Sequence, residues 1–218
     1  MILKRGSKGP KVVKLQTLLK IKADGDFGQS TEKAVIEFQK KNKLVADGIV
    51  GIKTWNALEK NSNPISKNSE ELINLIDSAK ITRKIKRLIF HCTATSQSAT
   101  VASIQKYWKE KLGWKSPGYH IIVKPDGSWT QLTDFNAISN GVTGYNSDSI
   151  NVSYIGGIDA KGKAIDNRTP QQKEIFEIIY YAFKEKLPNI TFHGHNEFAN
   201  KACPSFNVKT WIASLTKL

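Results

Sequence analysis

Two histidines and one cysteine beyond residue 90 are of the residue types that bind transition metals. His195 and Cys203 lie eight positions apart, and His91 ends the apolar run Leu88-Ile89-Phe90, which predicts a buried strand. Neutral imidazole and thiolate suit zinc, and three protein ligands leave a fourth tetrahedral position open for water. Spacing alone leaves scattered core residues as the alternative, because free cysteine is commonly buried and these ligands form no dense cluster. The hypothesis of a metal site is favoured because all four histidines and both cysteines lie beyond residue 90.

Cys92 is badly placed to serve as a fourth ligand. Adjacent residues on a strand point to opposite faces, so if His91 faces the site, Cys92 faces the core behind it. We therefore expect both cysteines to be reduced. A Cys203 nucleophile paired with a histidine is the rival arrangement, but it leaves the second histidine without a role.

The composition bounds the class of protein. The chain has 218 residues, 39% hydrophobic and 24% charged, which is typical of a soluble globular protein with one large or two small domains. Its apolar runs are too short to span a membrane, so we expect no transmembrane segment. The first residues contain no apolar segment of a secretory signal. We expect either a mature sequence or a protein made in the cytoplasm and released by another route.

The net charge of +14 is spread evenly, with +7 on each side of Pro64. Such a surface attracts polyanions in general, including nucleic acids and the anionic polymers of a cell envelope. No RNP, zinc-finger or helix-turn-helix signature accompanies the charge. We therefore expect non-specific attraction to an anionic envelope and no specific nucleic-acid partner.

The first sixty residues contain an internal repeat. Residues 23–34 recur as residues 46–57, with Asp, two Gly, Thr and Ala coinciding at a constant offset of 23. Each copy predicts an Asp-Gly turn followed by a helix that begins near the Thr. Before them, Val12, Leu15, Leu18 and Leu19 share one helical face, with Pro10 in the first turn. Three short helices in a small bundle are predicted.

The rest of the chain alternates between predicted helices and strands. A polar, turn-rich linker is expected at 61–69. Helices are expected over 70–79, over 103–112 and from the N-cap Thr169 toward Leu187, and strands up to His91 and over 119–123 and 150–155. The fold class is therefore α/β, with a mixed central sheet flanked by helices and preceded by the three-helix bundle.

Several separated motifs beyond residue 86 occur together in the order found in one family. They are Phe90-His91-Cys92-Thr93-Ala94-Thr95, Gly113-Trp114, Gly118-Tyr119-His120, Gly144-Tyr145-Asn146, Gly156-Gly157-Ile158-Asp159 and Lys201-Ala202-Cys203-Pro204-Ser205-Phe206. From about Lys86 to Trp211 the chain resembles the type 2 N-acetylmuramoyl-L-alanine amidases, most closely the zinc amidases that phages use as lysozymes. The resemblance implies Zn²⁺ bound by His91, His195 and Cys203, with Tyr119 and Lys201 as catalytic residues. It also implies that zinc-activated water cleaves the amide between N-acetylmuramic acid and L-alanine.

The residues around the implied site also have ordinary explanations. Sequence alone favours a half-buried aromatic for Tyr119 and a solvated side chain for Lys201, and only the resemblance gives them catalytic roles. Lys201 lies two residues before the cysteine ligand, where its ammonium could stabilise an oxyanion. Glu197 either orients a ligand imidazole or is a surface carboxylate. His193 shares a strand face with His195 and is the alternative ligand.

The N-terminal segment resembles a peptidoglycan-binding module. The matching stretches are Val12 to Gln16, Asp24 to Thr31, Ala34 to Gln39 and Asp47 to Trp55. Most of these residues are turn formers and core, so only exposed members such as Asp26, Gln29 and Trp55 are candidates to contact a glycan. The predicted domains are 1–60 for this module, 61–69 for the linker and 70–218 for the zinc amidase.

Together these features predict an endolysin that acts on peptidoglycan as a monomer. We expect synthesis in the host cytoplasm and action on the cell wall after release. The alternatives are a bacterial autolysin of the same chemistry, a non-catalytic peptidoglycan-recognition protein, or a regulatory role through an RNA polymerase. Cys203 argues against the non-catalytic class, whose members tend to lose this ligand.

One position departs from the pattern of the phage enzymes. Related enzymes usually carry a histidine before the Gly-Tyr-Asn motif, and Asn140 stands at the corresponding position here. An asparagine can donate a hydrogen bond but cannot titrate near neutral pH. We therefore expect substrate positioning at this point to differ.

Overall fold

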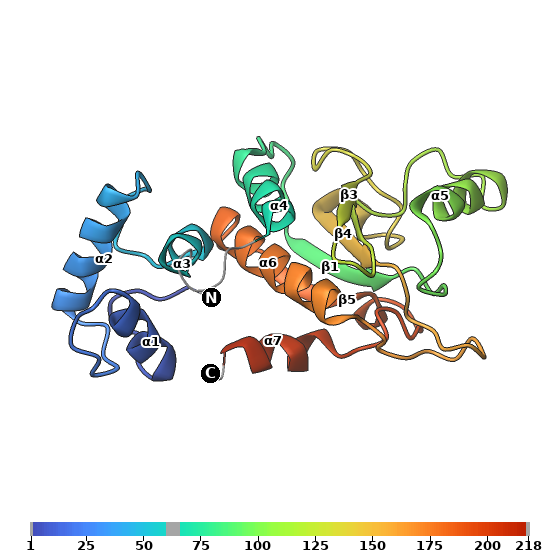
Figure 1. The fold of residues 1–218 in the computed structure, drawn as a ribbon. Helices are drawn as coiled ribbons and strands as arrows, with labels where there is room; N and C mark the ends of the chain where they lie inside the picture. Colours follow the sequence, from blue (N-terminus) through green and yellow to red (C-terminus); the bar gives the residue numbers. More distant parts are fainter. Residues whose placement is uncertain (1, 60–65, 217–218) are drawn as a thin grey trace. The chain divides into compact units, whose positions relative to one another are not determined.

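The computed structural model describes residues 2–59 and 66–216, which form two compact units (Figure 1). One unit comprises Met1–Glu71 with Ala213–Leu218, and the other comprises Leu72–Ile212. Most of the predicted linker lies outside the described residues, and helix α4 (Lys67–Ser78) begins within its last three positions. The domain boundaries at 60 and 70 stay a prediction.

The first unit contains three helices before the predicted linker: α1 (Pro10–Leu18), α2 (Gln29–Lys41) and α3 (Ile52–Glu59). Pro10 stands in the first turn of α1, where its missing N–H would have no intrahelical partner. The apolar faces meet in a core that contains the fully buried Leu15, Phe27 and Val35. The predicted three-helix region is confirmed.

The two copies of the sequence repeat carry the same hydrogen-bond arrangement. In the first copy, Nε2 of the buried Gln16 lies 2.8–3.0 Å from acceptors of Asp24, Asp26 and Thr31, and its Oε1 accepts the Gly25 N–H at 2.8 Å. In the second copy Gln39 makes the four equivalent bonds, to Asp47, Ile49, Thr54 and Gly48. Each glutamine thus links its own helix, α1 or α2, to the Asp-Gly turn that follows and to the next helix.

The second unit is built on a five-stranded sheet in the order β3-β2-β4-β1-β5. Strands β4 and β5 both pair in parallel with β1, β2 pairs in parallel with β4, and β3 runs antiparallel to β2. The strands span Arg87–Cys92 (β1), Ile121–Val123 (β2), Trp129–Gln131 (β3), Ser149–Tyr154 (β4) and Thr191–Gly194 (β5). The predicted mixed sheet is confirmed.

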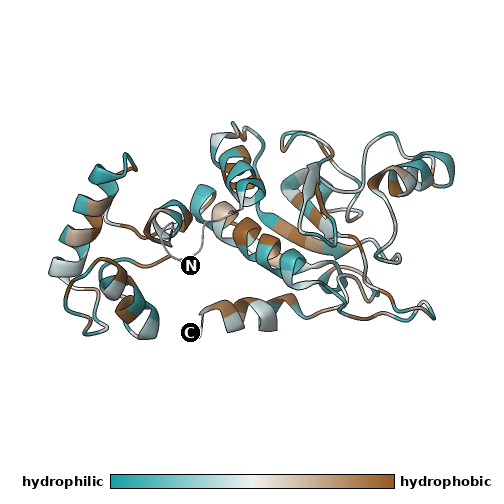
Figure 2. Ribbon diagram, in the orientation of Figure 1, coloured by the Kyte–Doolittle hydropathy of each residue, from teal (hydrophilic) through white to brown (hydrophobic). Residues whose placement is uncertain are grey.

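Helices cover both faces of this sheet, and its central strands are largely hydrophobic (Figure 2). On one face, Phe176 of α6 (Pro170–Lys186) contacts Phe90 and Tyr154, with ring centroids 5.0 and 5.9 Å apart. On the other face, Trp108 of α5 (Val101–Glu110) packs in a cluster with Ile122. Helix α7 (Val208–Thr216) and the short helices η1 (Asn146–Asp148) and η2 (His195–Glu197) complete the described elements.

Strand alternation divides polar from apolar side chains in the centre of the sheet. Phe90 and Tyr154 point to the α6 face, so their neighbours His91 and Ser153, which are register partners, point to the α5 face. Asn151 lies two residues before Ser153 and shares that face. On the α5 face, buried polar side chains therefore lie on the same side of the sheet as the apolar cluster that contains Trp108 and Ile122.

Most of the predicted elements are present, and the differences concern short ones. Thr169 caps α6 as predicted, accepting the Gln172 N–H at 3.1 Å. The predicted strand at 119–123 begins only at Ile121, so residues 119–120 precede β2. Strand β3 and helix α7 were not predicted, and β5 was expected only as a strand that contains His193 and His195. In the part of the chain that the structure describes, no helix has the length and apolar character needed to cross a bilayer.

We predict that Gln16→Leu and Gln39→Leu each destabilise the protein by about 2–4 kcal/mol. Each substitution leaves buried donors and acceptors of the neighbouring turn without a partner. Denaturant unfolding monitored by circular dichroism measures this loss. Gln29→Leu, at the exposed start of α2, is the control and is expected to change the unfolding free energy by less than about 0.5 kcal/mol. An equal loss of unfolding free energy at all three positions would contradict the stabilising role given to Gln16 and Gln39.

Candidate active site

The structure brings His91, His195 and Cys203 together on the α5 face of the sheet. One ligand atom from each residue lies within 4.8 Å of the others. The two imidazole centroids are 4.9 Å apart, and Cys203 Sγ lies 3.7 Å from His91 Nδ1. Two imidazoles and a thiolate are a donor set that suits zinc, and three ligands leave one position open.

Parallel pairing of β1 with β5 explains how residues 104 positions apart become neighbours. The carboxyl ends of parallel strands meet at one edge, where His91 lies near the end of β1 and His195 directly follows β5. The Asn196 N–H donates to the Cys203 carbonyl at 2.8 Å and so joins the segments of the other two ligands. At Gly194 an added Cβ would lie 2.9 Å from Pro204 Cδ, so the segment that follows Cys203 packs closely against this glycine.

The electrostatics of the site keep both imidazoles neutral. Burial and the neighbouring His195 lower the pKa of His91 to about 3, and burial and the Lys201 charge lower the pKa of His195 to about 4. Each ring therefore keeps a lone pair at neutral pH. Without a cation, the hydrogen bond with Cys92 and burial raise the pKa of the Cys203 thiol, so metal binding must displace its proton.

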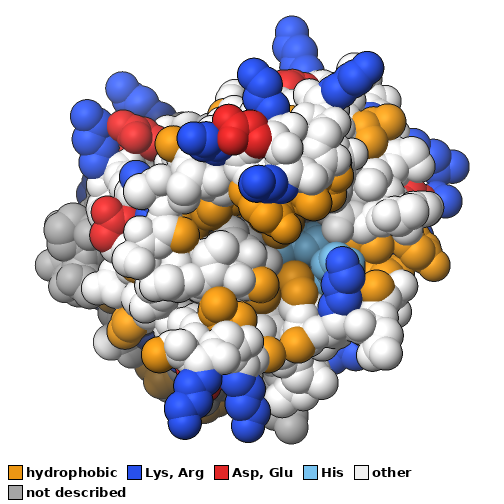
Figure 3. All heavy atoms as spheres, turned by 90° about the vertical axis from the view of Figure 1, so that its right-hand side faces the viewer, with side chains coloured by type: hydrophobic (Ala, Val, Ile, Leu, Met, Phe, Trp, Pro, Cys, Tyr) orange, Lys and Arg blue, Asp and Glu red, His pale blue; other side chains and the backbone are white. Residues whose placement is uncertain are grey.

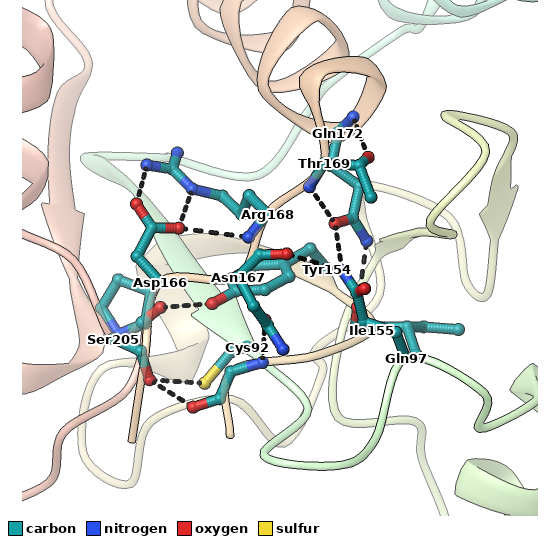
Figure 4. Close-up of polar contacts among 12 residues, drawn as sticks. Cys92, Gln97, Tyr154, Ile155, Asp166, Asn167, Arg168, Thr169, Gln172 and Ser205 are labelled. Atoms are coloured by element: carbon teal, nitrogen blue, oxygen red, sulfur yellow. Dashed lines mark hydrogen bonds and ion pairs between the residues drawn. The ribbon is translucent and has the colours of Figure 1, made fainter. Parts of the chain in front are cut away.

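Cys92 lies behind the site, as strand alternation predicts. Its thiol is buried and lies 3.6 Å from Ser205 Oγ, in the polar network drawn in Figure 4. Its backbone N–H donates to Cys203 Sγ at 3.3 Å. An added Cβ at Gly157 would lie 2.4 Å from the Cys92 sulfur, so glycine lets the next segment pack against this thiol. Both cysteines are free.

Tyr119 borders the metal ligands. Its ring lies 5.0 Å from that of His91 and packs edge-on against Trp108 at 5.3 Å. The hydroxyl donates to the Cys92 carbonyl at 3.3 Å. Loss of solvation raises the pKa of this hydroxyl well above its ordinary value, so it keeps its proton and can donate a hydrogen bond.

Lys201 is exposed, and its charge acts on the ligands. Its positive charge contributes to the lowered pKa of both His91 and His195. Figure 3 shows histidine side chains at the bottom of a hollow that hydrophobic side chains surround, with a cationic side chain beside it. Tyr119 therefore lies beside the candidate metal ligand His91, while the catalytic roles that the resemblance implies for Tyr119 and Lys201 stay predictions.

Of the two alternatives for Glu197, the structure favours the surface carboxylate: the residue is exposed and binds His193 Nδ1 at 3.1 Å, the Gly194 N–H at 2.9 Å and Lys209 Nζ at 2.9 Å. The expectation about His193 is wrong. His193 and His195 do not share a strand face, because β5 ends at Gly194 and His195 begins η2. His193 lies outside the candidate metal cluster.

Asn140 is held by the loop before Tyr119. Its side-chain amide donates to the Ser116 carbonyl at 2.8 Å, and its backbone N–H donates to the Pro117 carbonyl at 2.9 Å. The side chain thus links two loops.

One polar contact of His91 was not predicted from the sequence. His91 Nε2 lies 2.9 Å from Oδ1 of the fully buried Asn151. The available signal was the period of two in the predicted strand at 150–155, which puts the polar Asn151 and Ser153 on one face. What that signal could not supply was the pairing of this strand with β1.

Comparisons with known proteins agree with this geometry. The family model described as N-acetylmuramoyl-L-alanine amidase matches residues 81–206, and a model for a peptidoglycan binding domain matches residues 8–58. The endolysin of Escherichia phage T7 is 40% identical over 126 residues, which cover 57% of this chain and 83% of that protein. The endolysin of Enterobacteria phage K11 is 34% identical over 131 residues, covering 60% and 87%.

Solved structures share the fold at low identity. The Ph2119 endolysin from a Thermus scotoductus bacteriophage has a TM-score of 0.52 at 23% identity, covering 64% of this chain and 88% of that one. The amidase LysC from Clostridium intestinale has a TM-score of 0.53 at 20% identity, covering 62% and 87%. With a family model matched over more than half of its length and endolysins as relatives, this chain belongs to the N-acetylmuramoyl-L-alanine amidase family and is an amidase of the endolysin type.

Proposed function

We propose that this amidase binds Zn²⁺ through His91, His195 and Cys203 and cleaves the amide between N-acetylmuramic acid and L-alanine in peptidoglycan. The observation that supports it most is the approach of two neutral imidazoles and one thiol to within 4.8 Å, in a chain of the amidase family. A zinc ion supplies an activated water and polarises the scissile carbonyl when it is bound.

Tyr119 and Lys201 stabilise the negative charge that develops on the substrate carbonyl oxygen. The Tyr119 hydroxyl remains protonated at neutral pH, and the Tyr119 ring lies 5.0 Å from that of His91. By turning from the Cys92 carbonyl, its acceptor in this structure, the hydroxyl can donate to a substrate oxygen instead. Lys201 supplies a positive charge close to both histidine ligands. Donors fixed in advance around the site are worth most in an environment that excludes water.

Residues 1–60 hold the enzyme on the cell wall, residues 61–69 are the linker, and residues 70–218 carry the catalytic domain. The match of residues 8–58 to a peptidoglycan binding domain supports this division. The enzyme is made in the host cytoplasm and acts on the wall after release. Binding through one module raises the effective concentration of substrate at the other.

The first prediction is that activity requires zinc at the three ligands. Chelation is expected to abolish hydrolysis of purified sacculi, and Zn²⁺ is expected to restore it. Cys203→Ser is expected to lose bound zinc, because a neutral hydroxyl replaces the thiolate. Cys92→Ser is the matched control and keeps about one zinc per chain by elemental analysis. Full activity in a protein shown to be free of metal would overturn the mechanism.

The second prediction concerns Tyr119 and Lys201. Tyr119→Phe and Lys201→Ala are each expected to lower kcat on a defined muropeptide by about 10²–10³-fold, because each removes an oxyanion donor. Zinc content and Tm stay near those of the wild type. The controls are Tyr107→Phe, an exposed hydroxyl, and Lys173→Ala, on α6 at the opposite face of the sheet. Wild-type turnover in a zinc-replete Lys201→Ala protein would remove Lys201 from the mechanism.

The third prediction separates binding from cleavage. A protein lacking residues 1–60 is expected to hydrolyse soluble muropeptides at the wild-type rate but to sediment less with intact sacculi. Tethering changes local concentration and not chemistry. Zinc content and Tm of the shortened protein are the controls. Unchanged binding to sacculi would contradict the role given to the N-terminal module.

A further inference from the structure

Three polar side chains lie buried beneath the metal ligands and have no part in the chemistry described so far. Asn151, Ser139 and His120 are each fully buried, on the side of the sheet to which His91 points. Burying a polar group costs free energy unless the group is hydrogen-bonded. We therefore assign the donor and the acceptor of each contact among these three residues.

The three residues form one continuous hydrogen-bond chain that starts at His91. His91 Nε2 lies 2.9 Å from Asn151 Oδ1, and Asn151 Nδ2 lies 2.9 Å from Ser139 Oγ. Ser139 Oγ lies 3.1 Å from His120 Nδ1, and His120 Nε2 lies 3.2 Å from the Ala137 carbonyl. We call this series the hydrogen-bond chain.

The far end of the chain has a known direction. The backbone N–H of Asn151 donates to His120 Nδ1 at 3.0 Å, and a peptide N–H can only donate. His120 Nδ1 must therefore carry the lone pair, which leaves the ring hydrogen of a neutral imidazole on Nε2. That hydrogen points to the Ala137 carbonyl, which can only accept.

The neighbouring guanidinium does not change this assignment. Arg83 Nη2 lies 3.3 Å from His120 Nε2, but it also donates to the carbonyls of Phe135 and Ser149 at 3.0 Å. Accepting from Arg83 would require the His120 hydrogen to lie on Nδ1, opposite the Asn151 N–H. A positive charge at this distance also favours the neutral imidazole.

The direction then passes along the chain to the metal ligand. Because His120 Nδ1 carries no hydrogen, its hydrogen bond with Ser139 must be donated by the serine hydroxyl, which shares the Nδ1 lone pair with the Asn151 N–H. The serine oxygen in turn accepts from Asn151 Nδ2. The Asn151 amide therefore presents its oxygen to His91, which must donate from Nε2. The remaining lone pair of His91 is on Nδ1, the atom that lies 3.7 Å from Cys203 Sγ.

We propose that His120, acting through Ser139 and Asn151, fixes His91 as the Nε2–H tautomer, so that Nδ1 always faces the metal. The three are positioning residues, and the proposal rests on the metal site proposed above. The reversed amide would turn its N–H toward His91 Nε2 and force the ring hydrogen onto Nδ1, where it would block the ligand atom. A hydrogen bond to the distal nitrogen of a ligating histidine commonly sets its tautomer and orientation.

Packing holds the two rings and the amide in place. An added Cβ at Gly141 would lie 2.2 Å from Asn151 Cγ, so the backbone at Gly141 is in close contact with the amide. The Phe135 ring stacks on His120 with centroids 6.2 Å apart. The hydrogen bonds then need only select between the two ends of an amide whose plane is already fixed.

The direct test is the nitrogen chemical shifts of the histidine rings in the zinc-free, full-length wild-type protein. Long-range ¹H–¹⁵N spectra distinguish Nδ1–H from Nε2–H imidazoles without any substitution. We expect both His91 and His120 to be Nε2–H tautomers before zinc is added. An Nδ1–H form of either ring would overturn the proposal. This result does not depend on zinc chemistry, so the proposed metal site can fail separately, through wild-type protein that binds no zinc.

The second test is zinc affinity by competition with a fluorescent chelator. Asn151→Leu removes the acceptor and is expected to weaken zinc binding about 10–100-fold, whereas Asn151→Asp keeps an acceptor and binding. Ser139→Ala frees the amide to reverse and is expected to weaken binding by a smaller factor. Ser149→Ala is the matched control, since this buried hydroxyl of β4 has no hydrogen-bond partner among the described residues.

Two outcomes of that competition would overturn the proposal. One is wild-type zinc affinity in an Asn151→Leu protein with an unchanged circular dichroism spectrum. The other is an equal loss of affinity in Ser139→Ala and Ser149→Ala, which would indicate general loosening of the sheet. Should Asn151→Leu fail to fold, the ring shifts of the wild type still decide.

Discussion

The parallel pairing of β1 with β5 is the contact on which the rest of the site depends. Ladder hydrogen bonds from Arg87 to Phe90 set the register, and this register places His91 beside the residue that follows Gly194. A slip by one residue would turn His91 toward α6 and bring Cys92 to the site. The Asn196 N–H then donates to the Cys203 carbonyl and holds the cysteine segment beside the residue that follows Gly194.

Placing a ligand on a central strand has a consequence for its neighbours. The sheet is apolar on the α6 face, but on the α5 face His91 requires polar partners that water cannot supply, because it is 1% exposed. Asn151 on the adjacent strand meets that need, and its own amide must then be satisfied, which brings in Ser139 and His120. Each buried polar side chain thus needs another as its hydrogen-bond partner, and the Ala137 carbonyl is the last acceptor in the series.

The sequence predicted the features that depend on local pattern. Thr169 and the apolar positions after it specify α6, and the offset of 23 specifies two equivalent turns, because these signals lie within one or two elements. The bounds of strand β5 were not predicted, because its four residues contain one large apolar side chain, Phe192, and are too few to set a periodic pattern. The three candidate metal ligands were predicted from their residue types and from family resemblance, whereas the contact of Asn151 with His91 depends on strand pairing across 60 residues.

Buried amides serve both units, and the comparison indicates what an amide offers that an apolar side chain does not. Gln16 and Gln39 each present a donor end and an acceptor end to fixed backbone groups, which secures a turn. Asn151 uses the same asymmetry, but one of its partners is an imidazole with two possible tautomers. An amide with a fixed orientation therefore selects one tautomer, which a hydroxyl that both donates and accepts cannot do. On the proposed tautomer of His91, an amide at position 151 therefore does what a serine there could not.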